Sequence, residues 1–273
     1  MPYEIPPTED LIVSCKRMLN MGPPSSFKTT SLMTWPGPIH IQSYPGERGD
    51  ATIPRNRPGV TPHLWSESEA GKKPWLPRPT PSGTIVQLLE QRTFEILGGK
   101  YGEIRTFAGD GIHKYYSYVL DYVTAGAFFR GEEFEARLYA RSHEHFRHYI
   151  QAVMNSPVEY VVFTCWDGKE ADEAGAKSGP SHIYPNLPGK MAKEIMGEFG
   201  VVVYSIVDWA ARQPNKPAPA YWQLLPEGKV WGAAVKAPYE VVMKLPVKIP
   251  QGLPVLEATL AKAYTEAYPE VKK

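Results

Sequence analysis

The sequence has little cysteine, almost no net charge and no long apolar run. Its cysteines, Cys15 and Cys165, lie in or beside apolar stretches and lack the spacing of a disulfide framework or a zinc site. A net charge of +1 gives no overall field toward nucleic acid or an anionic membrane, so any DNA contact must come from local patches. No apolar run approaches the roughly 18 residues of a membrane span, and the N-terminal ten residues carry acids where a signal peptide carries lysines. We therefore expect a protein of the reducing cytoplasm, outside any membrane.

Proline is abundant but unevenly placed. Prolines crowd residues 45–83 among glycines and charged residues, which argues against a helix or a central strand there. We expect a long excursion or lid, because loops of this length usually carry function. Its basic residues, with Trp65 and Trp75, would suit single-stranded nucleic acid, although a solvated loop with tryptophans packed on the body is an equal interpretation.

Hydrophobic periodicity predicts alternating strands and helices in one domain spanning residues 1–273. Such an order implies an α/β fold with a mainly parallel sheet and helices on both faces. The strands are expected at residues 16–21, 39–44, 103–108, 158–165 and 201–207, and the helices at 29–35, 84–98, 112–123, 132–155, 190–199 and 255–268. Residues 168–185 read as a loop.

The C-terminal residues 220–273 are expected to hold an antiparallel hairpin and a closing helix. Residues 221–225 and 230–235 are the two strands of this hairpin, around the turn residues Pro226, Glu227 and Gly228.

The sharpest motif is residues 22–29, which follow a predicted strand and open a helix, as the pattern G-x-x-x-x-G-K-[ST] requires. In such a loop, backbone N–H groups point at phosphate oxygens, the lysine reaches the β- and γ-phosphates, and the threonine can ligate Mg²⁺. The competing interpretation is a proline-glycine turn before an ordinary helix. We expect ATP to bind along Gly22, Pro23, Pro24, Ser25, Ser26, Phe27, Lys28, Thr29 and Thr30.

Phe27 departs from this motif, because it stands where the pattern has its last glycine. A bulky side chain there would shrink the nucleotide pocket or displace the loop unless it points away from the phosphates. We expect the ring to pack into the apolar body.

The stretch GPPSSFKTT resembles the phosphate loop of RecA-type recombinases, including the recombination and single-strand-annealing ATPases that phages encode. The resemblance implies a RecA-like P-loop NTPase fold that uses ATP and Mg²⁺, with Lys28 in catalysis. It also implies that Glu47, shortly after the strand at 39–44, orients the attacking water; a solvated loop acid is the alternative. Asp110 falls at the second metal position, beside Thr29 as a Mg²⁺ ligand, or else caps the following helix.

Further segments are similar to the same family. The strand at 158–165 corresponds to its sensor strand, which places Thr164, Cys165 or Trp166 near the γ-phosphate. The region from Trp166 to Glu194, which contains PNLPGKMA, corresponds to a DNA-contacting loop followed by a helix. Lys190 and Lys236 are then candidate DNA contacts or charges donated across a subunit boundary, with ordinary surface lysines as the alternative.

The resemblance implies an ATP-dependent protein that handles DNA, with single-stranded DNA as the expected form. It also implies a ring or filament of identical subunits, located in the host cytoplasm if a phage encodes the protein. The alternative is a non-catalytic interaction protein that keeps the fold with a degenerate phosphate loop at Phe27. A small-molecule kinase is a third hypothesis, although no second phosphate-binding arginine motif is recognisable. His143, His145 and His148 lack the spacing of a zinc site and are expected on a helix surface or facing a partner.

Overall fold

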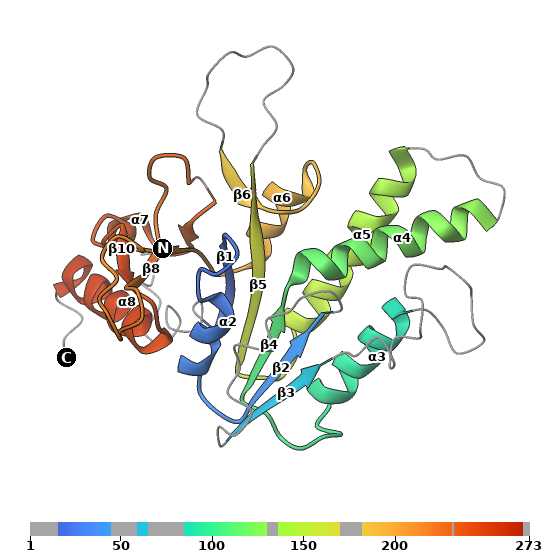
Figure 1. Cartoon of the computed structure of the whole chain (residues 1–273), viewed down its shortest axis with the longest axis horizontal. Helices are drawn as coiled ribbons and strands as arrows, with labels where there is room; N and C mark the ends of the chain where they lie inside the picture. Colours follow the sequence, from blue (N-terminus) through green and yellow to red (C-terminus); the bar gives the residue numbers. More distant parts are fainter. Residues whose placement is uncertain are drawn as a thin grey trace, which may run out of the picture. The chain divides into compact units, whose positions relative to one another are not determined.

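The computed structural model describes residues 16–44, 59–64, 85–129, 136–169, 182–230 and 232–269. The chain is an α/β protein with a mostly parallel, mixed sheet and several helices (Figure 1). It divides into two compact units, Met1–Trp35 with Thr164–Lys273 and Pro36–Phe163. The boundary falls within strand β5 (Tyr160–Lys169). In the described part of the chain, no helix is long and apolar enough to cross a membrane.

The first unit is built around two parallel strands, β1 (Arg17–Gly22) and β7 (Val201–Val207), in which Met21 is the partner of Tyr204. Both strands are almost continuously apolar and buried, as expected of strands covered on both faces. Strand β8 (Ala220–Gln223) is antiparallel to β7, and β10 (Lys248–Pro250) is antiparallel to β8. The unit therefore ends in antiparallel strands on one side.

Short helical segments complete this unit. In Figure 1, β1 leads directly into α2 (Lys28–Ser31), which continues as the 3₁₀ turn η1 (Leu32–Thr34). The remaining segments are α6 (Met191–Glu194), η3 (Ile195–Glu198), α7 (Tyr239–Val242) and α8 (Leu253–Ala267). Helix α8 buries Leu253, Leu256 and Leu260 along one side, at the spacing that an amphipathic helix requires.

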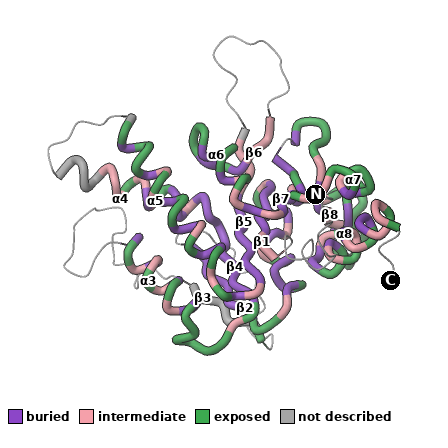
Figure 2. The backbone as a smooth tube through the Cα atoms, turned by 180° about the vertical axis from the view of Figure 1, so that it is seen from behind, coloured by how far each residue is buried: buried purple, intermediate pink, exposed green. Residues whose placement is uncertain are grey.

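The second unit contains a parallel set of strands in the order β3-β2-β4-β5. Three helices pack together beside these strands: α3 (Ile85–Leu97), α4 (Ile112–Phe129) and α5 (Ala136–Met154). The strands that precede β5 are β2 (Ile39–Ser43), β3 (Val60–Leu64) and β4 (Thr106–Asp110). Buried residues follow β2 and β4, whereas exposed residues mark the outer sides of the helices (Figure 2).

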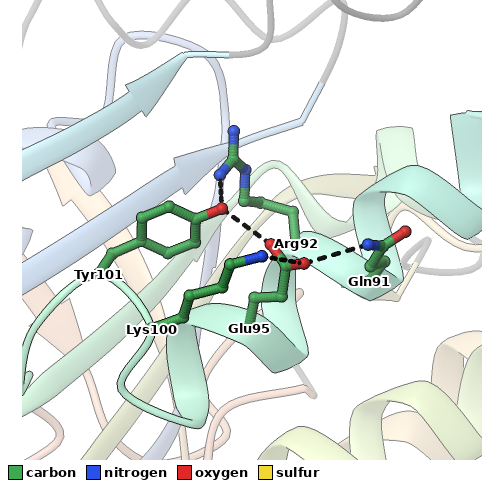
Figure 3. A network of polar contacts seen from close by, with 5 residues as sticks. All are labelled: Gln91, Arg92, Glu95, Lys100 and Tyr101. Carbon is green, nitrogen blue, oxygen red and sulfur yellow. Dashed lines mark hydrogen bonds and ion pairs between the residues drawn. The ribbon is translucent and has the colours of Figure 1, made fainter.

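A surface network closes the C-terminal end of α3. The carboxylate of Glu95 accepts hydrogen bonds from Lys100 Nζ (2.7 Å), Tyr101 Oη (2.8 Å) and Gln91 Nε2 (3.1 Å). Figure 3 shows these side chains converging on Glu95, with the guanidinium of Arg92 donating to the Tyr101 hydroxyl. These donors hold the pKa of Glu95 well below its usual 4.5, at about 2, with the Lys100 hydrogen bond as the largest cause. The ionised carboxylate of Glu95 therefore stabilises the turn after α3 through its hydrogen bonds with Lys100 and Tyr101.

The structure corrects the C-terminal hairpin. Strand β8 pairs with β7 on one edge and β10 on the other, so neither edge is left for residues 230–235. Instead, β9 (Ala234–Val235) pairs with the first residues of β7, beyond the end of β8 on the same edge. Apolar alternation located the strands, but it could not identify their partners.

Two further segments differ from what the sequence predicts. Residues 168–185 do not form a simple loop, because β5 continues to Lys169 and pairs antiparallel with β6 (Ile183–Pro185). The proline-rich stretch contributes β3, which pairs only with β2 in the strand order and therefore tolerates Pro62. The rest of residues 45–83, including Trp65 and Trp75, lies outside the described residues.

Candidate functional site

The loop after β1 has a backbone shaped by residues in unusual conformations. Gly22 passes so close to β7 that an added Cβ would lie 2.8 Å from the Ser205 carbonyl oxygen, so no side chain fits there. Further along, Ser25 (φ 62°) and Phe27 (φ 60°) are left-handed. Phe27 leads directly into the right-handed helix α2. A left-handed residue next to a right-handed one points successive N–H groups into one concavity, which suits an anion.

Phe27 has the backbone conformation that a glycine would adopt most easily at this position. Holding a non-glycine residue there costs about 1–2 kcal/mol, but the loop keeps its path. The ring is half-buried rather than enclosed by the core, contrary to the expectation of inward packing. It packs against Trp209, with ring centroids 5.8 Å apart and planes tilted by 58°.

Lys28 places a buried ammonium group within this loop. The residue is 7% exposed. Its Nζ donates to the Gly22 carbonyl (2.8 Å), the Pro23 carbonyl (2.7 Å) and the Ser26 hydroxyl (3.2 Å). These three oxygens lie on the loop itself, so the ammonium is held at the centre of the loop. Phosphate oxygens are strong acceptors for an ammonium group placed in this way.

A chain of buried hydrogen bonds fixes the base of the loop. Ser205 Oγ on β7 donates to Asn20 Oδ1 on β1 (2.6 Å), and Asn20 Nδ2 donates to Ser31 Oγ on α2 (3.1 Å). Ser31 Oγ in turn donates to the Lys28 carbonyl (2.6 Å). These three side chains are buried, so each bond is shielded from competing water. The chain holds α2 in a fixed position on the two strands.

Gln251, next to β10, holds the loop from another direction. Its Nε2 donates to the Ser26 carbonyl (3.0 Å) and to the Tyr221 carbonyl (3.5 Å). Because a trans peptide is planar, fixing the Ser26 carbonyl also directs the Phe27 N–H to the opposite side. Sequence reasoning missed Gln251, since it belongs to no motif and lies far along the chain from the loop.

Asp110 belongs to the other compact unit, at the carboxyl end of β4. It is 1% exposed, and its partner in the parallel pairing with β2 is Ser43. The Asp110 carbonyl accepts a hydrogen bond from the Tyr44 N–H (3.1 Å). The hydroxyl of Ser43 is buried as well and receives no hydrogen bond from a described residue. Sequence reasoning had not singled out Ser43, which lies between predicted core positions.

Next to this carboxylate lies a buried cluster of hydroxyl groups. The hydroxyls of Tyr44 and Tyr149 are 2.9 Å apart, and that of Tyr149 is 3.0 Å from Thr93 Oγ1. Gln42 Nε2 donates to Thr93 Oγ1 (2.9 Å), which joins β2 to α3 and α5. Burial raises the pKa of Tyr44 well above its usual 10, and the neighbouring tyrosines and Asp110 add to the shift. The cluster stays neutral and connects the helices to the strand.

A second polar cluster lies between the three helices of this unit. Glu90 accepts hydrogen bonds from Tyr115 Oη and from His145 Nε2 (2.6 Å). This hydrogen bond to Glu90 raises the pKa of His145 above its usual 6.5. His145 was expected on a helix surface, and it is part-buried with this specific partner. The contact joins helix α5 to helix α3 within the same unit.

The remaining candidate residues of the first unit do not join the loop through any described hydrogen bond. Lys190 is exposed at the start of α6, and Lys236 Nζ donates to the Gly197 carbonyl. In the sensor segment, Thr164 and Cys165 are buried and Trp166 is half-buried. Asp167 is an acidic residue that the motif did not identify as a candidate. It accepts a hydrogen bond from the Tyr204 hydroxyl (3.0 Å).

Of the three remaining candidates, the structure describes Thr29 and Thr30. Glu47 lies outside the described residues. Thr29 is half-buried and Thr30 is exposed at the start of α2. In the described ranges, no three His, Cys, Asp or Glu side chains gather as a metal-binding group.

The comparisons with known proteins leave the family open, because no family model matches the chain and no curated protein matches it. The fold and the loop define its class by themselves. It is an α/β protein with a mostly parallel, mixed sheet, in which a buried lysine begins the helix α2 that follows β1.

Proposed function

We propose that this protein binds ATP with Mg²⁺ at residues 22–30, as a RecA-like P-loop protein. The observation that carries the proposal is the buried ammonium of Lys28 inside a loop whose backbone Ser25 and Phe27 hold in left-handed conformations. The ammonium donates to oxygens of the loop and is thereby held inside it. Phosphate oxygens are charged and form strong hydrogen bonds with an ammonium, which supports a phosphate chain as the ligand of this loop.

Mg²⁺ would arrive with the nucleotide. It prefers oxygen ligands and usually takes one or two from the protein, the others coming from phosphates and water. Thr29 offers a hydroxyl at the start of α2, and Asp110 offers a buried carboxylate at the end of a strand. Each of these oxygens is of the kind that Mg²⁺ prefers, and the two roles are those that the resemblance implies. Glu47 keeps its proposed role of orienting water in hydrolysis.

The proposed activity is an ATPase that single-stranded DNA stimulates, in an assembly of identical subunits. This step rests on the similarity of residues 22–30 and of PNLPGKMA to RecA-type proteins, with Lys190 and Lys236 as the basic residues proposed to contact DNA or a neighbouring subunit. The non-catalytic alternative is based on Phe27, which replaces the last glycine of the phosphate-loop motif. The glycine-like backbone of Phe27 weakens that starting point, because the loop follows its path despite the side chain.

Binding is tested by thermal unfolding with and without ATP and Mg²⁺. A ligand that binds only the native state, at a hundred times its Kd, adds about 2.7 kcal/mol to the free energy of unfolding. Wild type should therefore melt at a higher temperature with ATP, Lys28→Ala should show no shift, and Lys244→Ala, which removes an exposed lysine of the same unit, should behave as wild type. An unchanged melting temperature of wild type at saturating ATP contradicts the proposal.

Turnover is tested by ATP hydrolysis with and without single-stranded DNA. The proposal expects hydrolysis above that of Lys28→Ala, a further increase with DNA, and a loss of roughly a hundredfold or more in Glu47→Gln with binding retained. ATP binding with turnover equal to that of Lys28→Ala would support the non-catalytic alternative instead.

A further inference from the structure

We infer that Trp209 is the residue on which the base of the bound nucleotide stacks. This inference rests on the proposed ATP site and adds a base subsite to it. Trp209 is 52% exposed, whereas most large aromatic residues of the first unit are buried or half-buried. It contacts Phe27, the residue directly before Lys28 in the loop.

The position of Trp209 follows from the pairing of β1 with β7. Met21 is opposite Tyr204, so the chain turns into the loop at Gly22 while β7 continues for three more residues to Val207. Trp209 comes directly after this extension. In open α/β sheets, ligands bind beyond the carboxyl ends of parallel strands, and Trp209 lies at such an end together with the loop.

The turn that carries Trp209 is held by its own hydrogen bonds. The Asp208 N–H donates to the Pro219 carbonyl (2.9 Å), and Asp208 Oδ1 accepts from the Ala211 N–H (3.1 Å). The Arg212 N–H donates to the Trp209 carbonyl (3.3 Å). The indole is therefore presented from an ordered turn, which reduces the entropy lost when a planar ligand stacks on it.

The chemistry that suits this surface is a planar aromatic ring attached to a phosphate chain. Stacking of a base on an aromatic side chain strengthens binding by roughly five- to 150-fold, and every nucleobase has a suitable face. An inorganic polyphosphate has no such face. Trp209 should therefore affect the binding of nucleotides and leave the binding of polyphosphate unchanged.

The test compares ATP and inorganic tripolyphosphate, each with Mg²⁺, by calorimetric titration. We expect Trp209→Ala to weaken ATP binding about tenfold or more and to leave tripolyphosphate binding unchanged. Trp209→Phe keeps an aromatic face and should stay within about threefold of wild type. The matched control is Tyr239→Ala, which removes a 72% exposed aromatic residue of the same unit and should bind both ligands as wild type.

Three outcomes overturn the inference in distinguishable ways. If Trp209→Ala binds ATP as tightly as wild type, Trp209 does not contact the base. If it loses ATP and tripolyphosphate equally, Trp209 acts only by supporting Phe27 and the loop. If wild-type protein binds neither ligand, the proposed function itself is wrong, and the base subsite falls with it.

Discussion

The side-chain amide of Gln251 donates a hydrogen bond to the carbonyl of Ser26 at 3.0 Å, across 225 positions of sequence. The segment around β10 thereby controls the orientation of one peptide in the loop that holds Lys28. Through that peptide, the C-terminal part of the first unit influences which N–H groups face the loop interior.

Replacing Gln251 with Ala should therefore weaken ATP binding modestly. A neutral hydrogen bond contributes about 0.5–1.5 kcal/mol, which corresponds to a loss of about two- to tenfold in affinity, with a comparable decrease in the free energy of unfolding. Calorimetric titration and urea unfolding measure the two effects. Gln213→Ala, at an exposed glutamine of the same unit, is the control. Affinity equal to wild type would show that the loop keeps its shape without this bond.

At Phe27, glycine should be better tolerated than alanine. Both changes remove the ring contact with Trp209, which is worth about 0.5–1.5 kcal/mol beyond area burial. Only glycine also relieves the left-handed strain, so Phe27→Gly should unfold with a free energy about 1 kcal/mol higher than Phe27→Ala. Thermal or urea unfolding of the two variants gives the difference. The reverse order would mean that Phe27 is not left-handed in solution.

The hydroxyls of Tyr44 and Tyr149 should prove energetically coupled. Tyr149→Phe leaves the buried Tyr44 hydroxyl without this partner, which should lower the free energy of unfolding by about 1–3 kcal/mol. Tyr44→Phe should have a similar effect, and the double variant should lose less than the sum of the two, by about 1 kcal/mol. Urea unfolding of all four proteins completes the cycle, with exposed Tyr239→Phe as the control. Strict additivity would exclude an interaction between the two hydroxyls.

Glu95 should contribute to the acid dependence of stability. Its pKa is about 2 in the folded chain and near 4.5 when unfolded, so the unfolded state takes up the proton first as the pH falls. The stabilising contribution is complete above about pH 4.5 and is lost as the pH falls toward 2. Glu95→Gln should therefore show a smaller decrease in melting temperature than wild type between pH 5 and 2.5. Glu257→Gln, on helix α8 in the first unit, serves as a comparison. Identical slopes for Glu95→Gln and wild type would mean that the network of Figure 3 does not persist in solution.

The strands buried on both faces could be predicted from sequence almost to the residue. The run at 201–207 is apolar except for Tyr204 and Ser205, and β7 has the expected bounds because a mostly apolar run of this length suits a buried strand. The strand expected at 103–108 is instead β4, Thr106–Asp110. The prediction ends too early because Gly109 and Asp110, the last two residues of the strand, are residue types typical of a turn. The residue at this strand position is a glycine because Phe163 and Tyr44 occupy the space that a side chain would need.

The loop could also be located from sequence, but the contacts that shape it could not. The motif identified Lys28, whereas Gln251, Ser205 and Trp209 belong to segments whose position depends on strand pairing. Pairing is a tertiary property, since the same alternation suits any neighbour of complementary burial. For that reason the sequence predicted the wrong partner for β8, and Gln251, which directly follows the true partner β10, was missed.

The polar side chains of β2 also have a consequence for how the second unit assembles. Gln42 and Tyr44 lie on the same face of the strand and meet Thr93 and Tyr149 there. If β2 slipped by one position against β4, both side chains would move to the opposite face, and buried hydroxyls of two helices would lose their acceptors. Each such loss costs about 1–3 kcal/mol, whereas a purely apolar interface would tolerate the slip at a lower cost. The hydroxyl cluster therefore stabilises the native register of β2 against β4 relative to a register shifted by one residue.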